Sequence, residues 1–238
     1  MSIQNMTHKT KVFIAGTDTG VGKTSVCAAL LYGAQQQGLK TLGLKPVAAG
    51  AELIEGIYRN DDGVQLMKYS SVNLPYEQVN PICLREAIAP HIAAEREGKS
   101  LSMNRIAGYC RGALIGPAEF SVVEGAGGWR VPLNSRETMA DLAKELELPV
   151  ILVVGMRLGC LNHTLLTVEA MIRDGINLVG WVSTKLDEDM PVYQENLDAI
   201  ASRLTCPLLA QVPFIKKPSA ETFAKHIDIP KIMALMKP

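Results

Sequence analysis

The chain has 238 residues, of which 47% are hydrophobic and 20% charged, and its 24 basic and 24 acidic side chains give a formal net charge of zero. This composition is typical of a globular protein with a well-buried core. The neutral balance argues against a nucleic-acid backbone or an acidic membrane as partner.

The cysteines argue against a disulfide-rich or zinc-binding protein, and the apolar runs argue against a secreted or membrane-spanning one. Five cysteines are widely spread without a Cys-x-x-Cys pair, which favours reduced thiols over a disulfide framework or zinc site. The first segment, Met1 to Lys11, lacks the apolar core of a signal peptide, and apolar runs such as Pro149 to Val154 are too short to cross a bilayer. We expect a cytoplasmic protein with a single domain over residues 1–238, because no repeat or linker interrupts it.

Short β-branched runs alternate with helix-patterned segments, which predicts an α/β fold with a parallel sheet and crossover helices. Several runs are apolar almost throughout, as in strands that helices cover on both faces. In chain order, the predicted strands are Lys11–Ala15, Thr41–Lys45, Phe120–Glu124, Val150–Val154, Leu178–Val182 and Leu208–Gln211. We expect a doubly wound, mostly parallel sheet flanked by helices, with its ligand crevice at the carboxyl ends of the strands.

Capping and breaking residues bound the predicted helices. The helix that begins near Ser25 should end near Gln37-Gly38, since glycine is a frequent C-terminal cap. Thr138 is placed to cap the predicted helix Met139–Leu146. In chain order, the predicted helices are the one that opens with the apolar stretch Ser25–Tyr32 and ends near Gln37-Gly38, then Met139–Leu146, Leu161–Arg173, Pro191–Leu204 and Pro230–Met236. Three prolines interrupt the looser pattern between Gly50 and Gly98, where we expect short helices near the active site.

The loop after the first strand is the most informative motif. It is rich in Gly and Thr and leads through Lys23-Thr24 into the first helix. Its spacing fits a P-loop if Thr17 takes the place of the first glycine, and backbone N–H groups of such a loop bind phosphate oxygens. Lys23 would reach the β- and γ-phosphates, and the Thr24 hydroxyl would ligate Mg²⁺. We therefore expect a P-loop NTPase-like protein that binds a nucleoside triphosphate.

Other polar residues could complete this site. Lys45 ends a predicted strand, from which its ammonium could stabilise transferring phosphoryl oxygens. Glu124 ends a buried strand, where a P-loop enzyme places an acidic metal ligand. Asn60-Asp61-Asp62 offers carboxylates that could cap a helix or ligate Mg²⁺, and the local sequence leaves both roles open. The run Gly159–His163 opens a helix whose N–H groups could hold a carboxylate.

Together these segments resemble the dethiobiotin synthetase family, the ATP-dependent carboxylases that close the ureido ring before biotin. The resemblance runs in order over nearly the whole chain and thins after Val182. The matching segments are Gly16–Thr19, Val21–Thr24, Lys45–Ala48, Asn60–Asp62, Val79–Pro81, Pro90-His91, Glu124–Trp129, Leu158–His163 and Gly180–Val182. The nearest alternative is a regulatory ATPase of the MinD/ParA type, but those proteins carry a signature lysine early in the P-loop, where Asp18 stands here.

The resemblance implies a reaction and its partners. An amine of 7,8-diaminopelargonic acid takes up carbon dioxide, and the resulting carbamate attacks the γ-phosphate of ATP. The second amine closes the ring on this mixed anhydride, which gives dethiobiotin, ADP and phosphate. The implied cofactor is Mg²⁺, with ATP as co-substrate. The family pairs as homodimers with the substrate at the subunit interface. From the neutral charge balance we expect neither nucleic acid nor membrane as a partner.

The resemblance also implies site residues. The catalytic residues would be Lys45, Lys23 and Thr19. The nucleotide would bind Asp18, Thr19, Gly20, Val21, Gly22, Lys23, Thr24 and Thr184. The metal ligands would be Thr24, Asp62 and Glu124. The substrate would contact Lys45, Ala49 and Gly125, with its carboxylate against Gly159, Cys160 and Asn162 of the neighbouring chain.

Three positions depart from the family pattern. Thr184 stands where some members have an Asn that reads the adenine edge. Because a hydroxyl replaces an amide with both donor and acceptor, we expect a preference for ATP with weakened discrimination between bases. Gly20 replaces an acidic residue of some relatives, and Ala49 replaces a common Ser.

Overall fold

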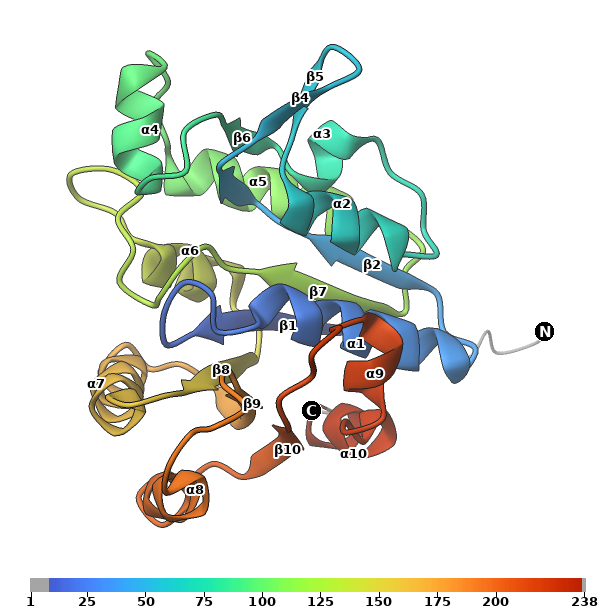
Figure 1. Cartoon of the computed structure of the whole chain (residues 1–238). Coiled ribbons are helices and arrows are strands. Elements are labelled where there is room, and N and C mark those ends of the chain that lie inside the picture. The colour runs from blue at the N-terminus through green and yellow to red at the C-terminus, as the bar shows by residue number, and fades with distance from the viewer. Residues whose placement is uncertain (1–8, 237–238) are drawn as a thin grey trace.

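The computed structural model describes residues 9–236 and is built on a six-stranded sheet of order β10-β9-β8-β1-β7-β2 (Figure 1). Every neighbouring pair in this sheet is parallel. Its strands are β1 (Thr10–Gly16), β2 (Thr41–Leu44), β7 (Phe120–Glu124), β8 (Val150–Met156), β9 (Leu178–Lys185) and β10 (Leu208–Val212). Most of the Met1–Lys11 segment lies outside the described residues.

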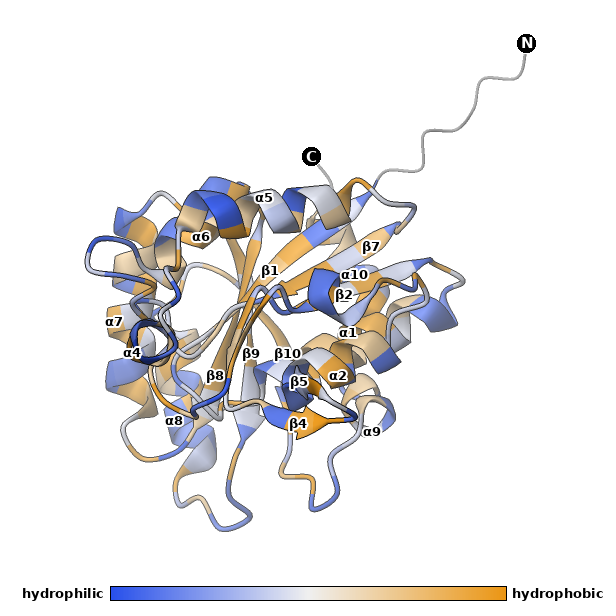
Figure 2. Cartoon of the chain, turned by 90° about the horizontal axis from the view of Figure 1, so that it is seen from above, coloured by the Kyte–Doolittle hydropathy of each residue, from blue (hydrophilic) through white to orange (hydrophobic). Residues whose placement is uncertain are grey.

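Helices cover both faces of the sheet because its strands alternate between two apolar cores. In β1, Phe13 and Ala15 belong to one core, whereas Val12 and Ile14 belong to the other. Figure 2 shows hydrophobic residues along the central strands. The first core packs against α5 (Met103–Leu114), α6 (Met139–Leu146), α7 (Cys160–Arg173) and α8 (Tyr193–Ala201). The second packs against α1 (Lys23–Gln36), α2 (Asp61–Lys68), α9 (Ala220–Ala224) and α10 (Ile229–Leu235). The predicted doubly wound fold is confirmed.

The predicted elements differ from the observed ones mainly at their ends. The strand Phe120–Glu124 and the helix Met139–Leu146 have the predicted bounds. Helix α1 ends at Gln36, beside the predicted stop at Gln37-Gly38, and begins two residues before Ser25. Helix α8 is shorter than the predicted Pro191–Leu204 at both ends, and Val192 is its N-cap. Helices α5 and α9 were not predicted.

The segment between β2 and α5 contains the predicted short helices and additional small strands. Besides α2, the helices here are α3 (Tyr76–Val79) and α4 (Pro90–Arg96). Two small sheets were missed: β3 (Val47–Ala49) with β6 (Ile82–Leu84), and the hairpin of β4 (Glu52–Ile54) and β5 (Ile57–Arg59). This segment lies over the carboxyl end of β2 (Figure 1).

The parallel arrangement brings the predicted site motifs to one edge of the sheet. The P-loop follows β1, Lys45 follows β2, and Glu124 is the last residue of β7. Glu124 pairs in register with Ile14 of β1, so the tip of β7 lies beside the start of the P-loop. Within the described residues, none of the helices has the length and apolar character needed to span a membrane.

Candidate active site

The P-loop is shaped by two glycines and holds a buried lysine. Gly20 and Gly22 have φ angles of 71° and 90°, a left-handed conformation that residues with a Cβ rarely adopt. Gly22 precedes the first turn of α1, which begins at Lys23. The Lys23 side chain folds back over the loop, and its Nζ donates to the Asp18 carbonyl at 2.8 Å. Lys23 is 6% exposed, so its ammonium lies inside the loop rather than in bulk solvent.

Four side chains from different elements converge beside this loop. Lys45 Nζ lies 2.6 Å from Glu124 Oε1 and 2.7 Å from Asp62 Oδ2. Thr24 Oγ1 lies 2.7 Å from Asp62 Oδ1 and 2.8 Å from Glu124 Oε1. The structure therefore brings together the three predicted metal ligands and one predicted catalytic lysine, which are separated by up to 100 positions in the sequence.

The N-terminus of α2 determines which aspartate reaches the cluster. Asn60 caps this helix, since its side chain accepts a hydrogen bond from the Asp62 N–H at 3.0 Å. Its amide group also donates to the carbonyls of Ala49 and Gly50. Asp62 then points from the first turn toward Thr24 and Lys45, whereas Asp61 is exposed. Neither aspartate is the cap, and the sequence analysis had assigned no role to Asn60.

A buried polar network holds the backbone of Lys45. Asn80 Nδ2 donates to the Lys45 carbonyl at 2.7 Å, and its Oδ1 accepts from the Tyr76 hydroxyl at 2.8 Å. Asn80 is 2% exposed, and so removal of its amide would leave buried polar groups without partners. Asn80 was not among the predicted site residues, although Val79-Asn80-Pro81 belongs to the segments that carry the family resemblance.

The charges of the cluster shift each other's pKa values. Burial would lower the pKa of Lys45, but Glu124 and Asp62 together raise it well above its usual value. Burial would raise the pKa of Asp62, but Lys45 and the Thr24 hydroxyl hold it below its usual range. The pKa of Lys23 is lowered to about 8, first by burial and then by the Lys45 charge. The raised pKa keeps Lys45 charged, whereas Lys23 loses its proton as the pH rises through about 8.

The lowered pKa of Lys23 predicts a pH dependence for phosphate binding. The free protein loses the Lys23 proton as the pH rises through about 8, while bound phosphate favours the charged form. Binding above pH 8 must therefore take up a proton, and affinity should fall by on the order of tenfold per pH unit. Calorimetry with ADP from pH 7.5 to 9.5, in buffers of different ionisation enthalpy, measures both effects. This range lies above the ionisation of phosphate near pH 6.

Lys23→Met is the control for this titration. It should bind more weakly at every pH, and its affinity should no longer depend on pH in this range. A wild-type affinity that stays constant from pH 7.5 to 9.5, without proton uptake, would exclude Lys23 as the titrating contact.

The donor set at the cluster fits a magnesium ion. Glu124 Oε1 receives both the Lys45 and the Thr24 contacts, while its Oε2 is buried without a hydrogen-bond partner. A free carboxylate oxygen next to a hydroxyl and a second carboxylate suits a hard cation. Within residues 9–236 there is no group of three or more His, Cys, Asp or Glu side chains that could hold a metal alone. This agrees with Mg²⁺ sites that use one or two carboxylates and complete the ligand shell with phosphate and water.

A cavity of about 500 Å³ opens next to the cluster. Its polar lining consists of the contacting pair Lys45 and Asp62, together with Thr19, and Ala49 also lines it. The rest of its wall is mostly apolar, formed by Ala48, Ala87, Ile88, Ala89, Pro90, Ala126, Val131 and Pro132. The predicted substrate contact Gly125 does not line the cavity, but its carbonyl is 3.4 Å from Lys45 Nζ. The cavity therefore offers both charged groups and aliphatic walls to a ligand.

The remaining predicted residues lie apart from this cavity. Gly159 precedes α7 with a φ of 94°, Cys160 is buried in its first turn, and Asn162 is exposed. None of the three lines the cavity of its own chain, and their predicted role concerns a neighbouring chain. Asp18 forms an ion pair with Arg157, and its Oδ1 accepts from the Thr19 N–H at 2.7 Å. The sequence analysis missed Arg157.

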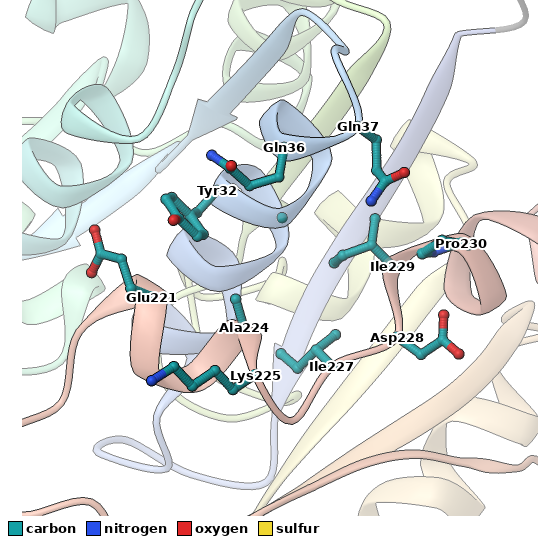
Figure 3. Close-up of a pocket in the computed structure, with 11 residues that line it drawn as sticks. Tyr32, Gln36, Gln37, Glu221, Ala224, Lys225, Ile227, Asp228, Ile229 and Pro230 are labelled. Atoms are coloured by element: carbon teal, nitrogen blue, oxygen red, sulfur yellow. The ribbon is translucent and has the colours of Figure 1, made fainter.

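Another hollow lies at the far end of α1, where α9 and α10 pack against it (Figure 3). Tyr32, Gln36 and Gln37 of the α1 end face Ile227 and Ile229 across it. No residue predicted for the site lines this hollow, and it carries no cluster of the kind seen at Lys45.

Comparison with known proteins identifies the family. A family model described as an AAA domain matches residues 10–222. ATP-dependent dethiobiotin synthetase BioD of Cellvibrio japonicus is 54% identical over 225 residues, covering 94% of this chain and 98% of that protein. The protein of the same name from Pseudomonas aeruginosa strain LESB58 is 48% identical, with coverages of 91% and 95%.

Solved structures with a similar fold are more distant in sequence. The septum site-determining protein MinD of Pyrococcus horikoshii, solved with Mg-ADP, has a TM-score of 0.54 and 18% identity, covering 94% of this chain and 88% of that one. The signal recognition particle receptor FtsY of Elizabethkingia anophelis, in complex with GDP, has a TM-score of 0.54 and 13% identity, with coverages of 100% and 66%. These likenesses establish the P-loop NTPase fold alone.

Proposed function

This chain belongs to the dethiobiotin synthetase family, and we propose that it is the enzyme that makes dethiobiotin from 7,8-diaminopelargonic acid, carbon dioxide and ATP in biotin biosynthesis. The observation that carries the proposal is the cluster of Lys45, Asp62, Glu124 and Thr24 between the P-loop and an apolar cavity. The Lys45 ammonium beside the P-loop suits phosphoryl transfer to a carbamate. The apolar wall of the cavity suits the alkyl chain of the diamine.

The proposed reaction is that of a cyclo-ligase. One amine of the substrate adds to carbon dioxide and loses a proton to give a carbamate. A carbamate oxygen attacks the γ-phosphorus of ATP, and the bond to the ADP oxygen breaks. The second amine then attacks the carbamoyl carbon and expels phosphate, which closes the ring. The protein mainly has to position these groups and stabilise charge, as is usual for phosphoryl transfer.

Each lysine has a separate task in this reaction. The P-loop binds the phosphates of ATP, and Lys23 lies where its ammonium can contact their terminal oxygens. Lys45 lines the cavity, where it can contact the carbamate and the transferring phosphoryl group. Thr19 lines the same cavity and would hydrogen-bond to a ligand there. The two lysines would neutralise the carbamate and the terminal phosphate of ATP. These two anions can then approach each other, although like charges otherwise repel.

We propose Thr24, Asp62 and Glu124 as the protein ligands of a magnesium ion. Support comes from their mutual contacts and from the unpartnered Glu124 Oε2. When bound, Mg²⁺ would neutralise charge on the β- and γ-phosphates. Lys45 pairs with both carboxylates, so its ammonium lies beside the residues that would hold the ion.

The other proposals concern assembly and location. We propose a single domain over residues 1–238 that forms a homodimer, with Gly159, Cys160 and Asn162 holding the distal carboxylate of the partner's substrate. The N–H groups at the start of the 14-residue helix α7 support this, because they favour an anion. All five cysteines are free thiols, which supports a location in the reducing cytoplasm.

A product assay tests the proposed function. The protein is incubated with Mg-ATP, ¹³C-bicarbonate and 7,8-diaminopelargonate, and mass spectrometry should detect dethiobiotin labelled at one carbon, with one ADP per product. Lys23→Met is the matched control and should give no product above background. ATP hydrolysis without labelled dethiobiotin would contradict the proposal and favour a regulatory ATPase of the MinD type.

A further inference from the structure

Thr184 is buried at the end of β9, in contact with the P-loop. Its hydroxyl donates to the Val21 carbonyl at 2.6 Å and lies 3.2 Å from the Val154 carbonyl. Thr184 is 2% exposed. Among residues 9–236, no backbone N–H of a turn, loop or helix cap donates to the Val21 carbonyl. The hydroxyl thus satisfies a buried acceptor in the middle of the phosphate-binding loop.

Side-chain packing fixes the same part of the loop. Val21 is 1% exposed and packs on Gly155 of β8, where an added Cβ would lie only 2.8 Å from Val21 Cγ1. Gly155 is the register partner of Thr184 in the neighbouring strand. A Cβ at Gly22 would lie 3.4 Å from the Thr184 methyl group, so that methyl group packs directly against the loop. Strands β8 and β9 therefore hold Val21 and Gly22 from one side.

We propose that Thr184 is a positioning residue that holds the P-loop in its phosphate-binding shape through the Val21 carbonyl, and that it does not read the base of the nucleotide. The single proton of the hydroxyl is used by the Val21 carbonyl, and the side chain is 2% exposed, so the lone pairs of its oxygen are buried as well. Turning the proton toward a base would leave the Val21 carbonyl buried without a partner, which is unfavourable. This role of Thr184 depends on the nucleotide binding that the proposed function includes. Within it, Thr184 supports binding of the phosphates by holding the loop that contacts them.

The test compares three ligands that share phosphates but differ in the base. Calorimetry with Mg²⁺ measures the affinities of ADP, GDP and inorganic triphosphate for the wild type and for Thr184→Val. The variant keeps the β-branched shape and removes the hydroxyl. We expect all three affinities to fall by a similar factor, about tenfold for one lost hydrogen bond to a buried carbonyl. The ratio of ADP to GDP affinity should stay unchanged.

Two further variants separate positioning from general damage to β9. Thr184→Ser keeps the hydroxyl and should restore affinity for all three ligands to near the wild-type value. Ser183→Ala removes the neighbouring buried hydroxyl, which faces Tyr193 instead of the loop, and should leave the affinities unchanged. Circular dichroism and thermal melts check that each variant is folded.

The outcomes are distinct. A loss confined to ADP, with triphosphate binding unchanged, would show that Thr184 reads the base and would overturn the inference. Unchanged binding of all three ligands by Thr184→Val would overturn it as well, as would an equal loss in Ser183→Ala. These measurements need no diamine substrate, so they stand even if dethiobiotin is not the product. Failure of the wild type to bind any of the three would contradict the proposed function together with this inference.

Discussion

Lys45→Met is expected to lower the turnover number by about 10² to 10³-fold, the usual cost of removing one preorganised donor from developing charge. The methionine side chain fills similar space without the ammonium, so the cavity keeps its shape. In the wild type, Lys45 remains charged throughout the physiological range, because Glu124 and Asp62 raise its pKa. Steady-state kinetics at saturating Mg-ATP and diamine measures the effect.

The same substitution should also lower stability, because Glu124 and Asp62 lose their shared counter-ion. Glu124 is fully buried, but the Asp62 side chain is 38% exposed. The loss should therefore be near the lower end for a broken buried pair, about 3 kcal/mol. For a chain of this length that loss corresponds to roughly 6–12 °C in the melting temperature. Added Mg²⁺ should stabilise the variant more than the wild type, since the ion and Lys45 compete for the same carboxylates.

Lys99→Met is the matched control. Lys99 also pairs with a carboxylate, that of Glu97 at 2.7 Å, but its own side chain is 48% exposed. The Glu97 side chain is 5% exposed, yet it keeps Arg85 as a second cation at 3.7 Å when Lys99 is removed. Its removal should cost less than about 1 kcal/mol and leave turnover unchanged. The account of Lys45 fails if Lys45→Met keeps wild-type turnover, or if Mg²⁺ stabilises the two proteins equally.

Glu124→Gln is expected to raise the Mg²⁺ concentration needed for half-maximal activity by about tenfold or more, since a neutral amide is a weaker ligand for a hard cation. The amide oxygen can still accept from Lys45 and Thr24, so the fold should persist. Activity titrated with Mg²⁺ at fixed ATP gives the midpoint. Melting curves with ADP and increasing Mg²⁺ give a second estimate that does not depend on turnover.

Glu119→Gln is the control for this variant. Glu119 directly precedes β7 at the opposite end of the strand, where its carboxylate accepts from the Lys40 N–H at 3.0 Å. The Glu119→Gln substitution should leave the Mg²⁺ concentration for half-maximal activity unchanged. Equal metal dependence of Glu124→Gln and the wild type would remove Glu124 from the proposed ligands.

The sheet could be predicted because its strands are nearly continuous apolar runs between turn residues. Parallel strands end at the same edge, which is why the proximity of Lys23, Lys45 and Glu124 followed from the strand assignment alone. Helix α5 was missed because Gly108 and Gly112 weaken its helical pattern. In the structure a Cβ at either glycine would meet only open space, while Ile106 and Cys110 face the core.

Other features depend on packing that no local pattern specifies. Asn60, Asp61 and Asp62 are all favourable N-cap residues, so the sequence does not decide which of them caps α2. Asn60 is the cap in the structure, and this places Asp62 in the first turn, where it faces the cluster. The direction of the Thr184 hydroxyl depends on the register of β8 and β9 and on the path of the P-loop. The contacts of Lys45 with both carboxylates likewise join segments far apart in the chain.

The most direct test is a crystal structure of the protein with Mg²⁺, a non-hydrolysable ATP analogue and 7,8-diaminopelargonate. The account predicts Nζ of both Lys23 and Lys45 within hydrogen-bond distance of the terminal phosphoryl oxygens. It also predicts Mg²⁺ on Thr24, Asp62 and Glu124, and the diamine in the cavity beside Lys45. A terminal phosphoryl group out of reach of Lys45, with the diamine bound elsewhere, would contradict it.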